Sequence, residues 1–272
     1  MNPDSPPRSL TGELVAKGFV PFAFGASTNL RRLDPAPFGH ALTMIDAEDP
    51  ANLPFHDLML RLNQHAYGGL GMPAWVQLDC ALLPSAFVGW ALPGHALPEE
   101  LRASLAAPSD DTLVPVAEAL AVPKATPEHW VTWSLCSVMR GHDLGFRAKL
   151  LALAAFRCTR ATGIVQLDNP ALRIHTRFGP LRLLSTWVPY HTRPEMTALY
   201  RLELPVSRLA SLDRGETVAL PEVERWLPTA DHEARRQMDV ALRSGDETWW
   251  LLHPGLALHR GRPCHPLSSW LI

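Results

Sequence analysis

The sequence lacks a strong net charge of either sign, because its 25 lysines and arginines are balanced by 27 aspartates and glutamates. Proteins that bind nucleic acid or anionic membranes mostly carry a basic surface. The balance therefore argues against both partners, and a phosphate-bearing ligand would have to be held by a local arrangement of groups. Long apolar runs are missing too, since no stretch of 18 apolar residues occurs, and we expect no membrane-spanning helix.

Cysteine is scarce, and its spacing excludes the common structural metal sites. The chain has no C-x-x-C pair and no ladder of cysteines with histidines, so we expect no metal centre. We interpret the four thiols as reduced residues of a cytoplasmic protein: Cys80, Cys136, Cys158 and Cys264. The first residues, MNPDSPPRSL, lack a basic segment followed by an apolar one, so they predict a disordered tail over residues 1–10 and no secretory signal.

Motifs of several enzyme classes are absent as well. No G-x-G-x-x-G follows an expected strand and no P-loop occurs, which argues against dinucleotide and nucleoside triphosphate enzymes. Ser134 and Ser137 lie in no G-x-S-x-G elbow, so serine hydrolase chemistry has no support. Cys136 and His142 could serve as nucleophile and base in an unrelated hydrolytic α/β enzyme, but the apolar strand around Cys136 favours an inert thiol.

The chain does have enough apolar residues for a large core, since they make up 47% of 272 residues. This length predicts one core domain with additions at its ends. We place the domain over residues 11–205 and expect residues 206–272 to form a C-terminal extension packed on it. The extension is predicted to contain a polar helix over residues 231–242 and a hairpin over residues 248–260.

The first half of the domain alternates between strand and helix patterns. Helices are expected over residues 54–66, ended by Gly68-Gly69, and from residue 98 onward. Strands are expected over residues 40–46, 74–83, 86–92, 113–122 and 129–139. The pattern predicts an α/β protein with a mixed, mainly antiparallel central sheet flanked by helices.

Residues 130–204 carry the most informative order of elements. A strand leads into the glycine-bearing loop 140–145 and then into an Ala/Leu-rich helix over residues 146–160. After a short strand over residues 164–168, Asn169 and Pro170 suit the cap and the first position of a helix over residues 170–178. Two more strands are expected, over residues 181–188 and 196–204.

The loop between the strand and the Ala/Leu-rich helix has the features of an anion site. A loop that enters a helix points backbone N–H groups at one spot, and the helix dipole adds a partial positive charge there. Gly141 and Gly145 allow a close backbone approach that a Cβ would block. Arg140, Arg147 and Lys149 could neutralise the anion. The segment is therefore predicted to bind a pyrophosphate.

This order of elements resembles the second half of the GNAT (GCN5-related N-acetyltransferase) fold, most clearly over residues 130–204. In that family an Arg/Gln-x-x-Gly-x-Gly/Ala loop binds the pyrophosphate of coenzyme A. The loop here reads Arg140-Gly141-His142-Asp143-Leu144-Gly145. Its first and last residues match the family's Arg and final Gly, whereas Asp143 stands where the family has its middle Gly. Phe178-Gly179 is similar to the family's later Gly-Phe, in inverted order.

The resemblance implies an acyl-CoA-dependent N-acyltransferase that uses acetyl-CoA or another acyl-CoA as cofactor. It implies that the donor is held by one continuous segment and by the start of the next helix: Ser137, Val138, Met139, Arg140, Gly141, His142, Asp143, Leu144, Gly145, Phe146 and Asn169. His175 falls four residues before Gly179, where the family often has a Tyr that protonates the leaving thiolate. An imidazole titrates near neutrality and could do the same.

The accepting amine also needs a base and a pocket. Candidate bases are Asp79, Glu118 and Glu128, and Glu118 stands out because it interrupts the apolar run VPVAEALAV, where burial would raise its pKa. The segment WVPYHTR gathers candidate acceptor-binding residues between two strands: Trp187, Tyr190, His191 and Arg193. Arg193 would face an anionic substrate. The expected partner is a small-molecule acceptor, and a homodimer is an open alternative.

Two further interpretations stay open beside acyl transfer from coenzyme A. Asp143 would place a carboxylate beside a pyrophosphate, which favours either an acyl carrier protein as donor or a non-catalytic binding or assembly module that has lost its donor site. The proposed site residues also have structural explanations. Asn169 is accounted for as a helix cap, His175 as a helix histidine, and the WVPYHTR segment as a packed aromatic corner.

Overall fold

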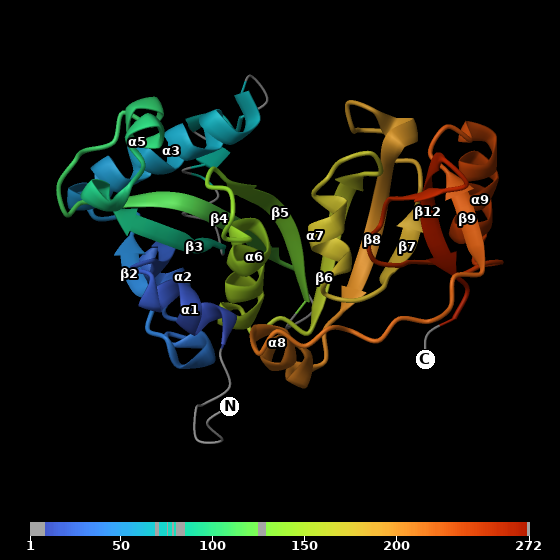
Figure 1. Ribbon diagram of the computed structural model, residues 1–272, viewed down its shortest axis with the longest axis horizontal. Coiled ribbons are helices and arrows are strands. Elements are labelled where there is room, and N and C mark those ends of the chain that lie inside the picture. Colours follow the sequence, from blue (N-terminus) through green and yellow to red (C-terminus); the bar gives the residue numbers. More distant parts are fainter. Residues whose placement is uncertain are drawn as a thin grey trace. The chain divides into compact units, whose positions relative to one another are not determined.

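The computed structural model describes residues 9–68, 71–74, 76, 77, 79, 85–124 and 129–270. The chain forms two compact units, residues Met1–Cys158 with Asp213–Gly215 and residues Thr159–Leu212 with Glu216–Ile272. Figure 1 shows the elements of both, and each unit is described by itself. The domain boundary predicted at residue 205 falls within the second unit and stays a prediction, and most of the predicted tail lies outside the described residues.

The described residues of the first unit form a mainly antiparallel sheet. Its strands, in chain order, are β1 (Val20–Gly25), β2 (Thr43–Asp46), β3 (Ala86–Pro93), β4 (Leu113–Pro123) and β5 (His129–Ser137). They lie in the order β2-β1-β3-β4-β5. Strands β1 and β2 pair in parallel, and the pairs β1 with β3, β3 with β4 and β4 with β5 are antiparallel. Strand β3 reads as an almost unbroken buried run, because helices cover both faces of the sheet.

The helices of this unit whose bounds the structure describes are α1 (Leu10–Ala16), α2 (Ser27–Leu30), α3 (Leu53–Tyr67), α5 (Glu99–Ser104) and α6 (Leu144–Ala155). Short 3-10 turns lie at Pro37–Gly39, Pro50–Asn52 and Gly94–Ala96. Helix α3 covers one face of the sheet and α6 the other, as Figure 1 shows. The α3 helix ends at Gly68, whose φ of 57° is easily adopted only without a Cβ.

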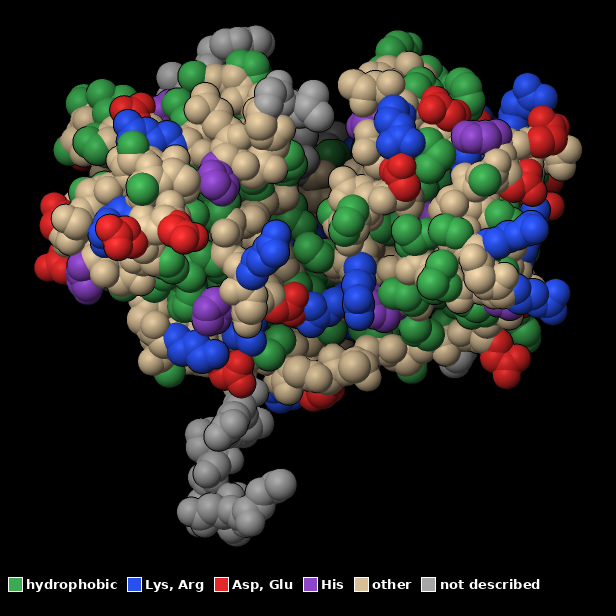
Figure 2. Space-filling model, turned by 45° about the horizontal axis from the view of Figure 1, so that its top comes forward, with side chains coloured by type: hydrophobic (Ala, Val, Ile, Leu, Met, Phe, Trp, Pro, Cys, Tyr) green, Lys and Arg blue, Asp and Glu red, His purple; other side chains and the backbone are tan. Residues whose placement is uncertain are grey.

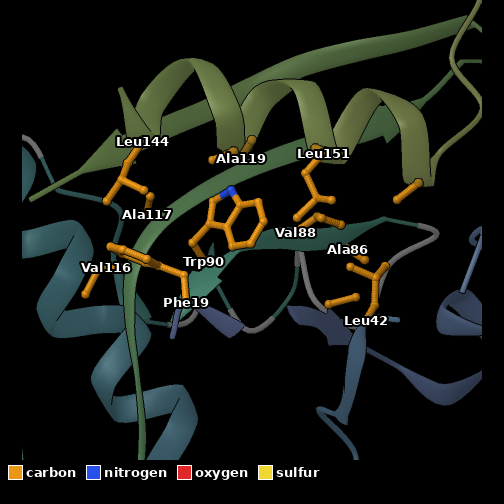
Figure 3. Packing of buried hydrophobic residues seen from close by; sticks show 14 of the residues in the cluster. Phe19, Leu42, Ala86, Val88, Trp90, Val116, Ala117, Ala119, Leu144 and Leu151 are labelled. Carbon is orange, nitrogen blue, oxygen red and sulfur yellow. The ribbon is translucent and has the colours of Figure 1, made fainter. Parts of the chain in front are cut away.

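Two hydrophobic clusters hold the two layers of helices on the sheet. On the α6 face, the fully buried Trp90 packs among Val88, Ala119, Leu144 and Leu151, as Figure 3 shows. On the α3 face, aromatic side chains dominate the second cluster: Phe22, Phe24, Phe55 and Phe87. Burying an aromatic or leucine side chain contributes about 1.5–3 kcal/mol. Residues on both faces of β3 and β4 are therefore fixed by packing.

The second unit contains an antiparallel sheet in the order β6-β8-β7-β10-β12. These strands are β6 (Arg160–Gln166), β7 (Leu181–Ser185), β8 (Thr197–Glu203), β10 (Trp250–Leu251) and β12 (Arg262–Ser268). Two short strands, β9 (Arg225–Pro228) and β11 (Ala257–His259), both pair with β12. The sequence alone did not predict β9 or β12.

Three α-helices belong to this part of the chain: α7 (Leu172–Thr176), α8 (Val206–Asp213) and α9 (His232–Ser244), with a 3-10 turn at Pro194–Met196. Helix α9 packs on β7 and on that turn. Asp231 caps α9 by accepting a hydrogen bond from the Ala234 amide at 2.9 Å. None of the helices within the described ranges is long and apolar enough to span a bilayer.

The predicted fold class, a mixed and mainly antiparallel sheet flanked by helices, is confirmed. The strand predicted over residues 74–83 is wrong where it is described, because residues 74, 76, 77 and 79 are helical. The helix predicted over residues 146–160 ends at Ala155, and Thr162-Gly163 lies inside β6.

The C-terminal hairpin predicted over residues 248–260 is wrong as well. The hairpin that the structure does contain joins β11 to β12 through Arg260-Gly261, whose φ values are 50° and 75°. Two positive φ angles define the type I′ turn that suits a two-residue hairpin. The Pro254-Gly255 pair was the more obvious turn signal in the sequence, yet the strands that pair lie further along the chain.

Candidate functional site

Glu118 is a carboxylate in the middle of the first unit's sheet. It lies on β4 opposite Gly89 of β3 and Cys136 of β5, and it is fully buried. Strand β3 approaches β4 so closely here that a Cβ added to Gly89 would lie 2.0 Å from the Ala117 carbonyl oxygen and 2.9 Å from the Glu118 Cα. Only glycine permits this approach, so the neighbouring strand fixes where the Glu118 backbone lies.

Neutral donors from β5 and from α3 surround one oxygen of the Glu118 side chain. Oε1 accepts hydrogen bonds from Ser134 Oγ at 3.2 Å, Cys136 Sγ at 3.4 Å and Asn63 Nδ2 at 3.5 Å. Oε2 has no hydrogen-bond partner in the part of the chain that the structure describes. Burial raises the pKa of Glu118 to about 7, although these three donors oppose the shift. The carboxyl can therefore gain or lose a proton near neutral pH, as a general base must.

Cys136 acts beside it as a neutral donor. Its side chain is only 5% exposed, and burial together with the Glu118 charge raises the pKa of the thiol well above its ordinary value. A thiol in this state is a poor nucleophile. The geometry thus argues against the alternative in which Cys136 carries out hydrolytic chemistry.

Tyr67 and Asn63 complete the cluster, and neither was assigned a role from the sequence pattern. The Tyr67 hydroxyl donates to the Leu135 carbonyl at 2.6 Å and accepts from the Leu135 amide at 3.3 Å. Burial and the nearby Cys136 and Glu118 raise the pKa of Tyr67 to about 12, so it stays a neutral hydroxyl. Asn63 and Tyr67 lie four residues apart on α3, a spacing that puts both on one helix face and was a usable signal.

The loop between β5 and α6 has the backbone geometry of an anion site. Strand β5 ends at Ser137 and α6 begins at Leu144, after Asp143 in the left-handed region with φ 54°. The Asp143 side chain forms no cap hydrogen bond, and the dipole of α6 gives the helix N-terminus a partial positive charge that favours an anion. Gly141 has φ 84°, and Arg140 is exposed beside it. The predicted role of this loop in binding phosphates stays a prediction.

Two of the three cations predicted to neutralise an anion at this loop are either paired or buried: Arg147 is paired and Lys149 is buried. Arg147 forms an ion pair with Glu13 of α1, with 3.0 Å between Nη2 and Oε2, and it also donates to the Leu10 carbonyl. Lys149 is only 2% exposed, and burial lowers its pKa to about 7. Of the three predicted cations, Arg140 is the one left on the surface of the loop. His142 packs its ring 5.2 Å from that of Phe19.

The chain has a net charge close to zero, and Figure 2 shows side chains of both signs on the drawn face. Within each unit, Lys and Arg side chains on this face lie among acidic and uncharged ones and form no continuous basic area. A phosphate ligand would thus depend on backbone donors and on single cations. In the described part of the chain, no group of three His, Cys, Asp or Glu side chains could hold a metal ion.

His175 and Asn169 lie in the second unit, around the short helix α7. His175 is 8% exposed, and its ring centroid lies 5.6 Å from that of Tyr200. Asn169 Oδ1 accepts a hydrogen bond from the Ala171 amide at 2.8 Å, which forms a turn before the helix. The helix itself begins at Leu172, later than predicted. Helix geometry accounts for Asn169, so a part in cofactor binding remains a prediction.

The predicted acceptor-binding segment is largely exposed. Trp187 is 40% exposed and Tyr190 fully exposed. His191 Nδ1 lies 3.0 Å from Thr197 Oγ1. Arg193 forms an ion pair with Asp168, with 2.8 Å between Nη1 and Oδ2, so it already has a partner in place of the predicted anionic substrate.

The predicted site residues thus divide between the two units. Glu118 and the residues from Ser137 to Phe146 belong to the first unit, whereas Asn169, His175 and the segment from Trp187 to Arg193 belong to the second. Asp79 is an exposed helical residue, and Glu128 lies outside the described residues. Within the first unit, the structure brings Glu118 together with Ser134, Cys136, Asn63 and Tyr67.

Comparison with known proteins yields structural similarity only. No protein-family model and no curated protein matches the sequence. A Lactobacillus plantarum protein assigned as an N-acetyltransferase matches 58% of this chain and 94% of its own, with 18% identity and a TM-score of 0.36. Aminoglycoside 6'-acetyltransferase type Ii matches 59% of this chain and 96% of its own, with 14% identity and a TM-score of 0.40.

A third similar structure is that of the NatC complex bound to Gag peptide and CoA. It matches 58% of this chain and 94% of its own, with 14% identity and a TM-score of 0.38. All three similarities are to N-acetyltransferases, the class that the sequence resembles. Because each TM-score is below 0.5, the fold class rests on the strand order of the chain itself.

Proposed function

We propose that the chain transfers an acyl group from acyl-CoA to the amine of a small-molecule acceptor. The observation that carries this proposal is the Glu118 carboxyl, fully buried with a pKa of about 7. A general base works best when its pKa lies near the working pH, and a structural carboxylate in a sheet would normally be solvated. The loop into α6, in the same unit, leads to a helix N-terminus whose partial positive charge suits an anionic donor molecule.

The proposed roles follow the chemistry of thioester aminolysis. The acceptor nitrogen attacks the thioester carbonyl carbon, a C–N bond forms and the C–S bond breaks. Glu118 takes the proton that the amine loses, and the departing thiolate takes a proton from solvent. Residues 140–146 would hold the phosphates, and backbone groups of Ser137, Val138 and Met139 would hold the pantetheine arm. Each proton transfer of this kind contributes about 10²–10⁴-fold to a rate.

Asp143 is the feature that favours a different function. Its carboxylate belongs to the residue that precedes α6, where the helix dipole favours an anion and a second negative charge would be repelled. A non-catalytic module without a donor site, or an enzyme that takes its acyl group from a carrier protein, would tolerate this residue. Changing Asp143 alone separates these alternatives.

Asp143→Gly is expected to tighten coenzyme A binding by about tenfold, because it removes one like charge near the phosphates and relieves a left-handed backbone position. Asp143→Asn is the matched control: it removes the charge and keeps a side chain in the left-handed position. Isothermal titration calorimetry with coenzyme A measures both. If only Asp143→Gly binds while the unmodified chain shows no binding at millimolar ligand, the non-catalytic module is favoured. If no form binds, the acyl-CoA proposal is contradicted.

A further inference from the structure

A cavity in the second unit is large enough for a small-molecule ligand and has no part in the proposed acyl transfer. It has a volume of about 430 Å³ and lies where the end of β8 and the start of β7 meet α8 and residues 216–221. All of the residues that line it belong to the second unit. Pockets for drug-sized ligands hold about 300–1,000 Å³, so the cavity suits a ligand of this kind.

Arg208 of α8 is the cation of this cavity, and it forms no ion pair in the described part of the chain. Its side chain is half-buried, and its one hydrogen bond within the described residues runs from Nη1 to the Phe178 carbonyl at 3.2 Å. Nε and Nη2 have no such partner, and neither is a fully buried atom. Their N–H groups are therefore open to a ligand, and the fork of a guanidinium suits the two oxygens of a carboxylate.

Gly179 lets this guanidinium lie directly against the backbone. A Cβ added to Gly179 would lie 2.7 Å from Arg208 Nη1, so a side chain at this position would displace the guanidinium. The contact with Gly179 and the hydrogen bond to the Phe178 carbonyl hold one side of the guanidinium in place. A cation that is already held loses less rotamer freedom when a ligand binds it.

Two carboxylates of the cavity limit the charge of its ligand. Glu203 is paired outside Arg208, because Arg160 Nε lies 3.1 and 3.0 Å from its two carboxylate oxygens. Glu216 is exposed to solvent, where its charge is screened. A ligand with several negative charges, such as a nucleotide, would be repelled by both carboxylates, whereas a single carboxylate can reach the open N–H groups of Arg208.

The rest of the lining is largely apolar and suits a flat ring. Three prolines and one tryptophan contribute to it: Pro180, Pro205, Pro221 and Trp250. Trp250 of β10 is half-buried, so part of its surface is accessible, and aromatic rings stack on one another. Ser207 and Thr217 are exposed residues of the same lining whose hydroxyls can donate to a carboxylate.

We propose that this cavity binds an aromatic monocarboxylate, with its carboxylate at the Arg208 guanidinium and its ring against Trp250 and the three prolines. Charge-assisted hydrogen bonds from the guanidinium hold the carboxylate. A neutral aromatic amide fills the apolar part of the cavity but forms no ion pair, and an aromatic amine is repelled by Arg208. The site does not depend on the proposed acyl transfer, because neither the Glu118 cluster nor the loop over residues 140–146 lines it.

The test is a nuclear magnetic resonance titration of the full chain with three probes that share one ring system: 2-naphthoate, 2-naphthamide and 2-naphthylmethylammonium. Naphthoate is expected to bind about tenfold more tightly than the other two, with shifts of the Arg208 Nε–H and Trp250 indole signals. In Arg208→Gln, naphthoate affinity is expected to fall about tenfold, to the level of naphthamide, while naphthamide binds unchanged. Arg262→Gln, which changes an exposed cation of the same unit outside the cavity, serves as the matched control.

Two results would overturn the monocarboxylate site. The first is equal affinity for naphthoate and naphthamide in the unmodified chain, or no binding of either. The second is a folded Arg208→Gln variant that binds naphthoate as the unmodified chain does. Arg208→Lys keeps the charge and loses the fork, so it is expected to fold and to bind naphthoate about three- to tenfold more weakly than the unmodified chain. The comparison of probes on the unmodified chain needs no variant, so it decides the matter even where Arg208→Gln does not fold.

Discussion

Glu118→Gln is expected to lower kcat for acyl transfer by about 10²–10⁴-fold, because the amide cannot take the proton that the acceptor amine releases. The substitution is also expected to remove the rising, acidic limb of the plot of kcat/KM against pH. The pKa of Glu118 is raised from 4.5 to about 7, so kcat/KM of the unmodified enzyme should rise with pH through about 7 as the carboxyl ionises. The variant should lack this rise.

The same substitution is expected to stabilise the fold at alkaline pH. Between about 4.5 and 7 the folded state keeps a proton that the unfolded chain has lost, so the unfolding free energy of the unmodified protein falls as pH rises through this window. A shift of this size corresponds to about 3 kcal/mol at most. Glutamine carries no charge at any pH, so the variant should be the more stable form at pH 8 and show no such advantage at pH 5.

Both expectations can be measured on one pair of variants. Thiol release from acetyl-CoA with a panel of amines gives the rates, and urea unfolding at pH 5 and pH 8 gives the free energies. Glu100→Gln is the matched control, because Glu100 is an exposed carboxylate of the same unit. A Glu118→Gln variant with full activity and an unchanged pH profile would contradict the role of Glu118 as base.

Gly89→Ala is expected to destabilise the first unit by about 3 kcal/mol or more, or to prevent folding. The added Cβ would lie 2.0 Å from the Ala117 carbonyl oxygen and 2.9 Å from the Glu118 Cα, and both neighbours are backbone atoms. The clash can be relieved only by separating β3 from β4 next to Glu118. We therefore expect activity to fall even in any fraction that folds.

Thermal and urea unfolding of Gly89→Ala measure this effect. Gly18→Ala is the control, since Gly18 has φ +85° and nothing within 4 Å of an added Cβ, so it reports backbone strain alone, at about 1–2 kcal/mol. A Gly89→Ala protein within 1 kcal/mol of the unmodified chain would show that β3 and β4 do not approach each other as closely as described.

Periodicity and turn residues predicted much of the first unit. Helix α3 follows from its apolar spacing and from Gly68, and β3, β4 and β5 follow from short runs rich in apolar residues. Residues 74, 76, 77 and 79 are helical where the sequence pattern predicts a strand, because a short apolar run without Gly or Pro inside it suits a helix as well. Strands β9 and β12 pair over a long sequence distance, and their runs contain proline, which demotes a strand pattern.

The candidate site was only partly predictable for a related reason. Glu118 could be found because a single charge interrupts an apolar run, whereas Tyr67 becomes relevant only through its contact with Leu135, 68 positions away. Arg235 and Arg236 are neighbours in one polar helix, and sequence alone gives no reason why the first is buried and the second exposed. Such differences depend on tertiary packing.

Calorimetric titration of the purified chain with coenzyme A and with acetyl-CoA tests the proposed acyl transfer most directly. The proposal predicts a Kd in the micromolar range for the unmodified protein and at least a hundredfold loss in Gly145→Asp, which puts a side chain and a negative charge in the first turn of α6. Circular dichroism should show that this variant remains folded. No heat of binding at millimolar coenzyme A, in a folded and otherwise intact protein, would contradict an acyl-CoA-dependent function.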